Sequence, residues 1–238
     1  MKKIFNIRFL SVLTNFLLIV VISIVFTVGF TYKTTVQISG SYTIEPIYRG
    51  NEKNKNVSIM FNVYENTDVV NEILSVLKEY NAKATFFVGG CWADDNQETL
   101  NKIIQEGHEI GNHGYFHKDH KNLSYEGNLS EINLTDGIVS GLCGYKMNLF
   151  APPSGSFSKK TLDASSDLGY KVIMWSKDTI DWRDNDKDLI FERATKNLKN
   201  GDLVLMHPKK HTLEVLPNVI SFYLHSGFSV VTVSQNII

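Results

Sequence analysis

From residue 57 to the C-terminus, short apolar segments alternate with segments of mixed polarity, and this alternation restricts the fold more than any other feature of the chain. The apolar segments, such as residues 57–61 and 84–88, are about five residues long. The segment between them carries Val69, Ile73 and Leu77 at helical spacing. Short strands that alternate with helices predict βα units around a parallel sheet.

About seven such units can be traced along the chain. Strands are predicted over residues 57–61, 84–88, 109–112, 147–150, 170–175, 203–206 and 228–233. Helices are predicted from Asp68 onward and over residues 98–106, 124–140, 160–168, 186–198 and 212–225, the last broken near Pro217. Seven units favour a distorted, closed (β/α) barrel over an open sheet. Such barrels collect functional groups at the carboxyl ends of their strands.

Several residues with useful chemistry follow these predicted strands. They are Asn62, His113, Ala151, Asp178 and His207. Because the carboxyl ends of parallel strands meet at one face of a barrel, we expect these residues to lie around one site.

The N-terminal segment differs in character from the rest. Lys2, Lys3 and Arg8 precede an uncharged run of about 24 residues from Phe9 to Tyr32, and about 20 apolar residues suffice to cross a bilayer as a helix. A cleavable signal peptide has a shorter apolar region and a small-residue exit. We therefore predict a signal anchor, a transmembrane helix over residues 1–32, with a secreted and cleaved form as the alternative.

The positive flank of this segment predicts a single-pass protein of the cell membrane whose domain lies outside the cytoplasm. The polar residues 33–56 are expected to form an extracytoplasmic stem, and residues 57–238 the barrel domain. A formal net charge of −1 gives no electrostatic reason to expect a nucleic acid as partner. Cys91 and Cys143 are expected at opposite faces of the barrel, so we predict two free thiols. We also expect the protein to be a monomer.

Two histidines four residues apart, His113 and His117, offer two imidazoles to one metal ion, since neutral imidazole is a common zinc ligand. A pair at this spacing also arises by chance in histidine-rich loops. Asp119 and His120 follow closely and could support the pair or simply face solvent.

Four segments with this chemistry occur in a fixed order: His113-Gly114-Tyr115-Phe116-His117, Ala151-Pro152-Pro153-Ser154-Gly155, Asp178-Thr179-Ile180-Asp181-Trp182 and Leu205-Met206-His207. Their order and content resemble the polysaccharide deacetylases of the NodB type, the family 4 carbohydrate esterases. The resemblance implies a metal-dependent hydrolase that removes N-acetyl groups from glycan. It also implies cell-wall polysaccharide containing N-acetylglucosamine as partner, and zinc or a similar divalent metal as cofactor.

The same resemblance assigns roles to individual residues. It implies that His113 and His117 bind the metal, that His207 acts as the catalytic acid, and that Asp181 orients it. It implies that the backbone N–H of Ser154 helps to hold the oxyanion. Three further residues are expected to contact the sugar: Tyr64, Pro153 and Trp182.

This chain departs from the family pattern where the reaction is hardest. The first motif, normally Thr-Phe-Asp-Asp-Gly, is here Met60-Phe61-Asn62-Val63-Tyr64. Asn62 replaces the general base and Val63 replaces a metal ligand, and neither side chain can perform those tasks. Ala151 stands where the family has the Arg that holds the base, and Glu65 is the best substitute for the third ligand. Metal binding is therefore expected to be weak or absent.

Two functions remain open at this point. The first is a membrane-anchored N-deacetylase of cell-wall glycan that uses a base other than Asn62. The alternative is a catalytically inactive, glycan-binding pseudoenzyme of the same fold.

Overall fold

The computed structural model describes residues 2–32 and 44–238. The chain divides into two compact units, of which the second spans Ile44–Ile238. In the first unit, helix α1 runs over Lys2–Tyr32. Within the described residues, no helix is both long enough and apolar enough to cross a membrane. Residues 33–43, which form part of the predicted stem, lie outside the described residues.

The second unit is built on one parallel sheet of eight strands. Seven strands form a continuous path in the order β5-β4-β3-β2-β1-β7-β6, and β8 pairs with the start of β1. The strands are β1 Asn56–Val63, β2 Ala84–Val88, β3 Glu109–Asn112, β4 Leu149–Phe150, β5 Lys171–Val172, β6 Lys177–Asp178, β7 Asp202–Met206 and β8 Ser229–Val230.

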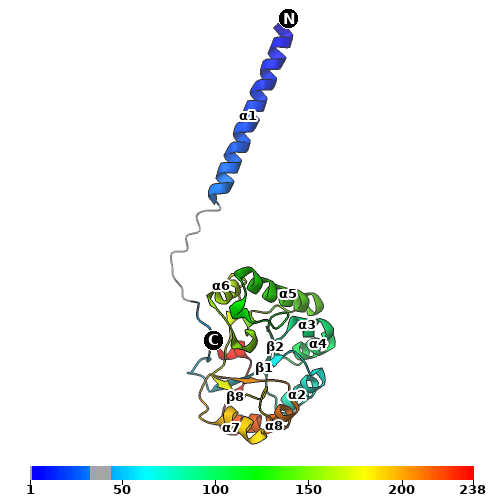
Figure 1. Ribbon diagram of the computed structural model, residues 1–238, viewed down its shortest axis with the longest axis vertical. Coiled ribbons are helices and arrows are strands. Elements are labelled where there is room, and N and C mark those ends of the chain that lie inside the picture. The colour runs from blue at the N-terminus through cyan, green and yellow to red at the C-terminus, as the bar shows by residue number, and fades with distance from the viewer. Residues whose placement is uncertain (1, 33–43) are drawn as a thin grey trace. The chain divides into compact units, whose positions relative to one another are not determined.

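Helices lie around the outside of this sheet, in an arc over the top, right and bottom of the view, with the strands toward the centre (Figure 1). Most of them connect one parallel strand to the next, as βα units require. They are α2 Thr67–Glu79, α3 Gly90–Asp95, α4 Gln97–Gln105, α5 Tyr125–Cys143, α6 Lys159–Asp167, α7 Lys187–Thr195, α8 Lys210–His225 and α9 Val233–Asn236.

The predicted barrel is not closed by strand pairing within the described part of the chain. β5 and β6 end the path, and each has only two residues. Ile47 forms a parallel bridge to Ile173, which follows β5, and Arg49 forms an antiparallel bridge to Asp202, which begins β7. The protein is therefore a half-barrel whose open side is bordered by a strap, defined here as residues 44–51.

The strap corrects the predicted domain boundary at residue 57. The Ile47 N–H donates to the Val172 carbonyl at 2.8 Å, and the Gly50 N–H donates to the Gly201 carbonyl at 2.7 Å. Arg49 forms a salt bridge with Asp202, whose side chain is buried. Residues 44–56 thus belong to the domain rather than to a separate stem, because their backbone completes hydrogen bonds that the short edge strands leave open.

The core has two layers on either side of the sheet. The outer layer packs strands against helices and includes Ile59, Phe61 and Val63 of β1. The inner layer contains Met60 of β1, together with Phe87, Leu149, Ala151, Ile173, Leu203, Leu205 and Val233. Since side chains alternate along a strand, Asn62 belongs to the inner face and Val63 to the outer face.

Several predicted elements differ from those observed. Helix α8 is unbroken and contains Pro217, so the predicted break is wrong. Strand β6 was not predicted, because Lys177–Asp178 contains no apolar residue to indicate a strand. The predicted final strand ends at Val230, and Thr232 instead caps helix α9, where its hydroxyl accepts from the Gln235 N–H.

The two cysteines are confirmed as free thiols. Cys91 lies in α3, which follows the carboxyl end of β2, and Cys143 is the last residue of α5.

Candidate active site

A cavity of about 500 Å³ lies at the carboxyl ends of the central strands. It brings together residues from several loops that follow parallel strands, as the sequence predicts. Its lining is Asn62, Tyr64, Glu65, His113, His117, Ser154, Trp175, Asp178, Trp182, Leu205, His207, Pro208 and Lys209.

His113 follows β3 and is buried at the base of this cavity. Its Nδ1 donates to the Ala151 carbonyl at 2.7 Å, which leaves Nε2 as the free acceptor of the neutral ring. Burial, with the nearby charge of His117, lowers the pKa of His113 to about 3. The rings of His113 and His117 lie 5.2 Å apart between centroids, so both predicted metal-binding imidazoles face one region.

His207 follows β7 and is held by Asp181, as the sequence predicts. The Asp181 carboxylate is fully buried and accepts from His207 Nδ1 at 2.8 Å and from the His207 backbone N–H at 2.7 Å. The Thr212 hydroxyl donates to the same carboxylate at 2.6 Å. This network fixes the imidazole of His207 in the cavity with Nε2 available to a ligand.

The positions of the missing base and metal ligand are structurally distinct from each other. Asn62 is 6% exposed, and its Oδ1 is enclosed without a hydrogen-bond partner among the described residues. Val63 is fully buried in the outer core layer and does not line the cavity. Ala151 is also fully buried, in the inner layer. An Asn at position 62 cannot accept a proton near neutral pH, so the retained cavity lacks a base at this position.

Glu65 lines the cavity but does not complete a metal centre. Its side chain is 59% exposed, and its carboxylate pairs with Lys209. A hydrogen bond from Lys209 is the main cause that lowers the pKa of Glu65. No group of three His, Cys, Asp or Glu residues in the described ranges 2–32 and 44–238 is arranged to hold a metal ion. Glu65 is therefore paired with Lys209 rather than grouped with His113 and His117, and the residues present do not form the family's three-ligand metal site.

Ser154 lies in the tight turn Pro153–Gly155 with a positive φ of 56°. The N–H groups of Gly155 and Ser156 donate to the carbonyls of Pro152 and Pro153, so the turn is closed by its own backbone. Ser154 lines the cavity, where its N–H was predicted to hold an oxyanion. Pro153 is buried and does not line the cavity, unlike the other predicted sugar contacts Tyr64 and Trp182.

Aromatic side chains form much of the cavity wall. Trp182 is 55% exposed, and the Arg183 guanidinium lies over its ring at 5.8 Å from the centroid, so one face of the indole already contacts a cation. The Tyr64 ring lies 5.0 Å from the His117 ring between centroids, and burial raises the pKa of Tyr64 to about 12. Trp175 also lines the cavity and packs on Gly155, where a Cβ would lie 2.6 Å from its ring. Sequence reasoning missed Trp175 because it reads as the end of a buried strand.

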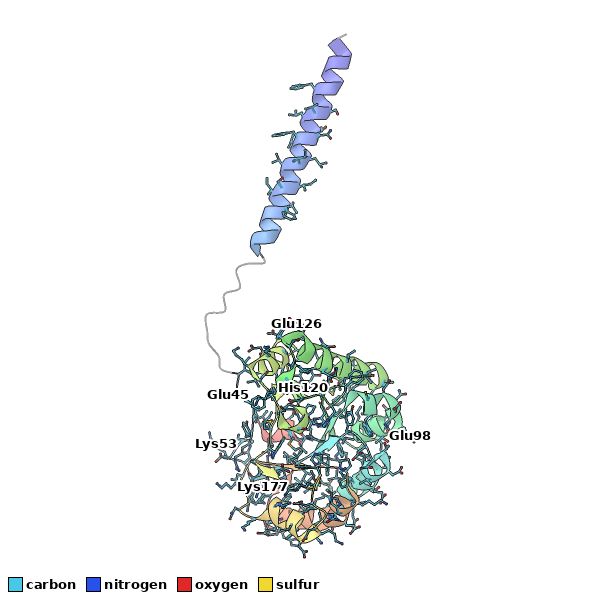
Figure 2. The ribbon with its side chains drawn as sticks, viewed as in Figure 1. Glu45, Lys53, Glu98, His120, Glu126 and Lys177 are labelled. Carbon is cyan, nitrogen blue, oxygen red and sulfur yellow. The ribbon has the colours of Figure 1, made fainter. Side chains whose placement is uncertain are left out.

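Asp178, Asp119 and His120 have structural roles. Asp178 lines the cavity, and its carboxylate accepts from the Ile180 N–H at 2.8 Å, as expected for a turn. The Asp119 carboxylate accepts from the Lys121 N–H and caps a short 3₁₀ turn. His120 is fully buried, so of the two alternatives for this residue the one in which it faces solvent is wrong (Figure 2).

A parallel half-barrel that gathers two histidines and an Asp–His couple at the ends of its strands defines a domain of the carbohydrate-deacetylase class. Residues 49–173 match the family described as polysaccharide deacetylase. The chain belongs to the polysaccharide deacetylase family.

Curated relatives include deacetylases that act on peptidoglycan. The chain is 36% identical over 192 residues to the uncharacterized protein YlxY of Bacillus subtilis, a match that covers 80% of this chain and 60% of that protein. It is 32% identical over 182 residues to the peptidoglycan-N-acetylmuramic acid deacetylase PdaC of Bacillus subtilis, covering 76% and 38% of the two chains. The chain therefore spans less than two thirds of either relative.

Solved structures include a relative described as a pseudoenzyme. The wild-type protein BA3943 of Bacillus anthracis, a CE4 family pseudoenzyme by that description, superposes with a TM-score of 0.80 at 33% identity, covering 82% of this chain and 70% of its own. A BA3943 mutant with the same TM-score and 31% identity, covering 82% and 72% of the chains, is described as having restored enzymatic activity.

Proposed function

We propose that this domain binds N-acetylated cell-wall glycan in the cavity at the strand ends and does not hydrolyse it. The observation that carries the proposal is the enclosed amide of Asn62. It stands at the position of the base, in a cavity that is still lined by His113, Trp182 and His207. Hydrolysis of an amide needs a base to activate water, and Asn62 cannot supply one. The similarity to a protein described as a pseudoenzyme supports the same conclusion.

The cavity remains suited to a sugar. Trp182 and Tyr64 offer aromatic faces, and Asp178 and His207 offer polar atoms that can contact hydroxyl groups. His113, with a pKa of about 3, is neutral near pH 7 and leaves the base of the cavity uncharged. An acetamido group is polar but uncharged, so it matches this environment. Relatives named as peptidoglycan deacetylases support cell-wall glycan as the partner.

A residual N-deacetylase is the second candidate, because the predicted catalytic acid His207 and its orienting residue Asp181 are both present and in contact. His207 keeps its contacts with Asp181, and Ser154 keeps its place in the cavity. Such an enzyme would need a base other than Asn62, and Glu65 would require release from Lys209 to serve. A divalent metal at His113 and His117 belongs to this candidate, and two imidazoles alone would hold it weakly.

The location of the domain forms a further part of the proposal. A signal anchor in residues 1–32 would place a monomeric domain on the outer face of the cell membrane, beside the cell wall. The uncharged run from Phe9 to Tyr32 behind Lys2, Lys3 and Arg8 supports it. Fractionation of cells that express the full chain tests it: the chain is expected with the membrane, and recovery of a shortened chain in the medium would favour the secreted form.

Glycan binding is tested by titration of the full chain with chitopentaose, followed by calorimetry. Trp182→Ala is expected to weaken binding about two- to tenfold, since an aromatic stacking contact contributes ~0.5–1.5 kcal/mol. Tyr48→Ala is the matched control, because Tyr48 is similarly exposed at 48% but does not line the cavity. Absence of binding by the wild-type chain, or equal losses in both variants, would contradict the proposed site.

A further inference from the structure

The loop that carries the two cavity histidines has an unusual backbone. Gly114 has a φ of +73° and His117 a φ of +53°. A non-glycine residue in the left-handed region costs ~1 kcal/mol or more, so this conformation needs support from its surroundings. The support must come from groups that contact residues 113–118, which we call the histidine loop.

Glu131 of helix α5 provides most of that support. Its side chain is 3% exposed. Oε2 accepts from the N–H of Tyr115 at 3.0 Å and from the N–H of Phe116 at 2.8 Å. Oε1 pairs with Lys118 Nζ at 2.9 Å. One buried carboxylate therefore holds two of the three backbone N–H groups between the histidines, and also the Lys118 side chain that follows them.

Two further side chains fix the start of the same loop. The Asn112 Oδ1 accepts from the Gly114 N–H at 2.9 Å, and the Asn112 amide donates to the Ile132 carbonyl of α5 at 2.9 Å. His120 lies against Gly114, where an added Cβ would be 2.9 Å from its Nε2. All of these contacts come from the protein itself.

We propose that Glu131 is a positioning residue that sets the geometry of His113 and His117 without a metal ion. In a three-ligand site the metal helps to hold its ligands, but here the third ligand is absent and the loop remains ordered by α5. The carboxylate positions the loop mainly by accepting hydrogen bonds from the N–H groups of Tyr115 and Phe116. The ion pair with Lys118 contributes less to this positioning. This role does not depend on which ligand the cavity takes.

The test is the imidazole spectrum of the full chain, recorded by long-range ¹H–¹⁵N correlation with EDTA present. EDTA is expected to leave the His113 and His117 signals of the wild-type chain unchanged. Glu131→Ala is expected to move both signals while the His225 signal stays, and the amides of Tyr115 and Phe116 should exchange about tenfold faster. Glu126→Ala is the matched control, an exposed acid on the same helix (Figure 2).

Two conservative variants separate positioning from general stability. Glu131→Gln keeps the reach and an acceptor oxygen, so it should retain the wild-type histidine signals. Glu131→Asp keeps the charge but withdraws the carboxylate by one methylene, so it should move the histidine signals. This variant also tests the proposal if Glu131→Ala does not fold. The proposal is overturned if EDTA alone moves the wild-type signals. It is equally overturned if Gln disturbs them as much as Asp, or if Glu131→Ala lowers the melting temperature without moving them.

Discussion

Restoring the missing groups should convert the binding site into a catalytic one. The change is Asn62→Asp with Val63→Asp and Ala151→Arg, which supplies a base, a metal ligand and a cation to hold the base ionised. We expect the triple variant to gain about a hundredfold or more in amide hydrolysis over the native chain, the usual contribution of a general base.

The structure predicts that each single change is destabilising. Asn62 is 6% exposed, so Asn62→Asp alone would bury an acid whose oxygen has no donor, and Ala151→Arg alone would bury an unpaired charge. Burying a charge without its partner costs ~3–5 kcal/mol. Val63 faces the outer core, so Val63→Asp forfeits ~1.5–3 kcal/mol of apolar burial, and the new carboxylate must turn away from the helices to reach a metal. We expect Asn62→Asp and Ala151→Arg together to cost less than the sum of the two single changes.

The assay is acetate release from chitooligosaccharide with added zinc or cobalt, together with urea unfolding of every single and combined variant. His207→Ala in the triple background is the control, since it should abolish the gain. The reasoning is refuted if the native chain already hydrolyses the substrate at the rate of active deacetylases and the triple change lowers that rate. Another residue would then be the base, and Glu65 would be the first to change.

Two further predictions concern the metal and the strap. Zinc should bind weakly and below one ion per chain in equilibrium dialysis, and His113→Ala should remove that binding; tight stoichiometric zinc that survives His113→Ala would contradict it. Arg49→Ala should lower the free energy of unfolding by ~1–3 kcal/mol, because it leaves the buried Asp202 carboxylate with only its bonds to Ser176 and the Lys199 N–H. An unchanged urea midpoint would show that the strap does not stabilise the half-barrel.

Much of the half-barrel follows from apolar patterning. Strand β2 occupies the predicted residues 84–88, because a buried parallel strand needs apolar or small side chains on both faces. Strand β3 occupies the predicted residues 109–112 although two of its buried residues are polar: Glu109 accepts from the Thr85 hydroxyl and Asn112 donates to the Ile132 carbonyl. The edge strand β5 lies within the predicted strand 170–175 but has only two residues, and the edge strand β6 was not predicted, since Lys177–Asp178 contains no apolar residue. The strap was also missed: Pro46 and Gly50 indicate a loop, and only its hydrogen bonds to distant residues such as Val172 and Gly201 give it a place in the fold.

The sequence predicted those site residues whose place in the cavity depends on their position directly after a strand. His113 and His207 follow β3 and β7, and the contact of Asp181 with His207 is as expected. The partner of Glu65 was not predictable, because Lys209 lies in a loop that follows a strand far along the chain. Nor was Glu131, which reads as an ordinary polar residue of a surface helix until its burial and its backbone contacts are seen.

The central claim is that the cavity binds N-acetylated glycan without cleaving it. The most direct measurement is to incubate the wild-type full chain with chitopentaose and with zinc, cobalt or EDTA, and to record binding by calorimetry and free acetate in the same samples. The account predicts saturable binding that His207→Ala or Trp182→Ala weakens, with no acetate above the protein-free control in any metal condition. Acetate release that increases with protein concentration, continues over many turnovers and disappears in His207→Ala would contradict it.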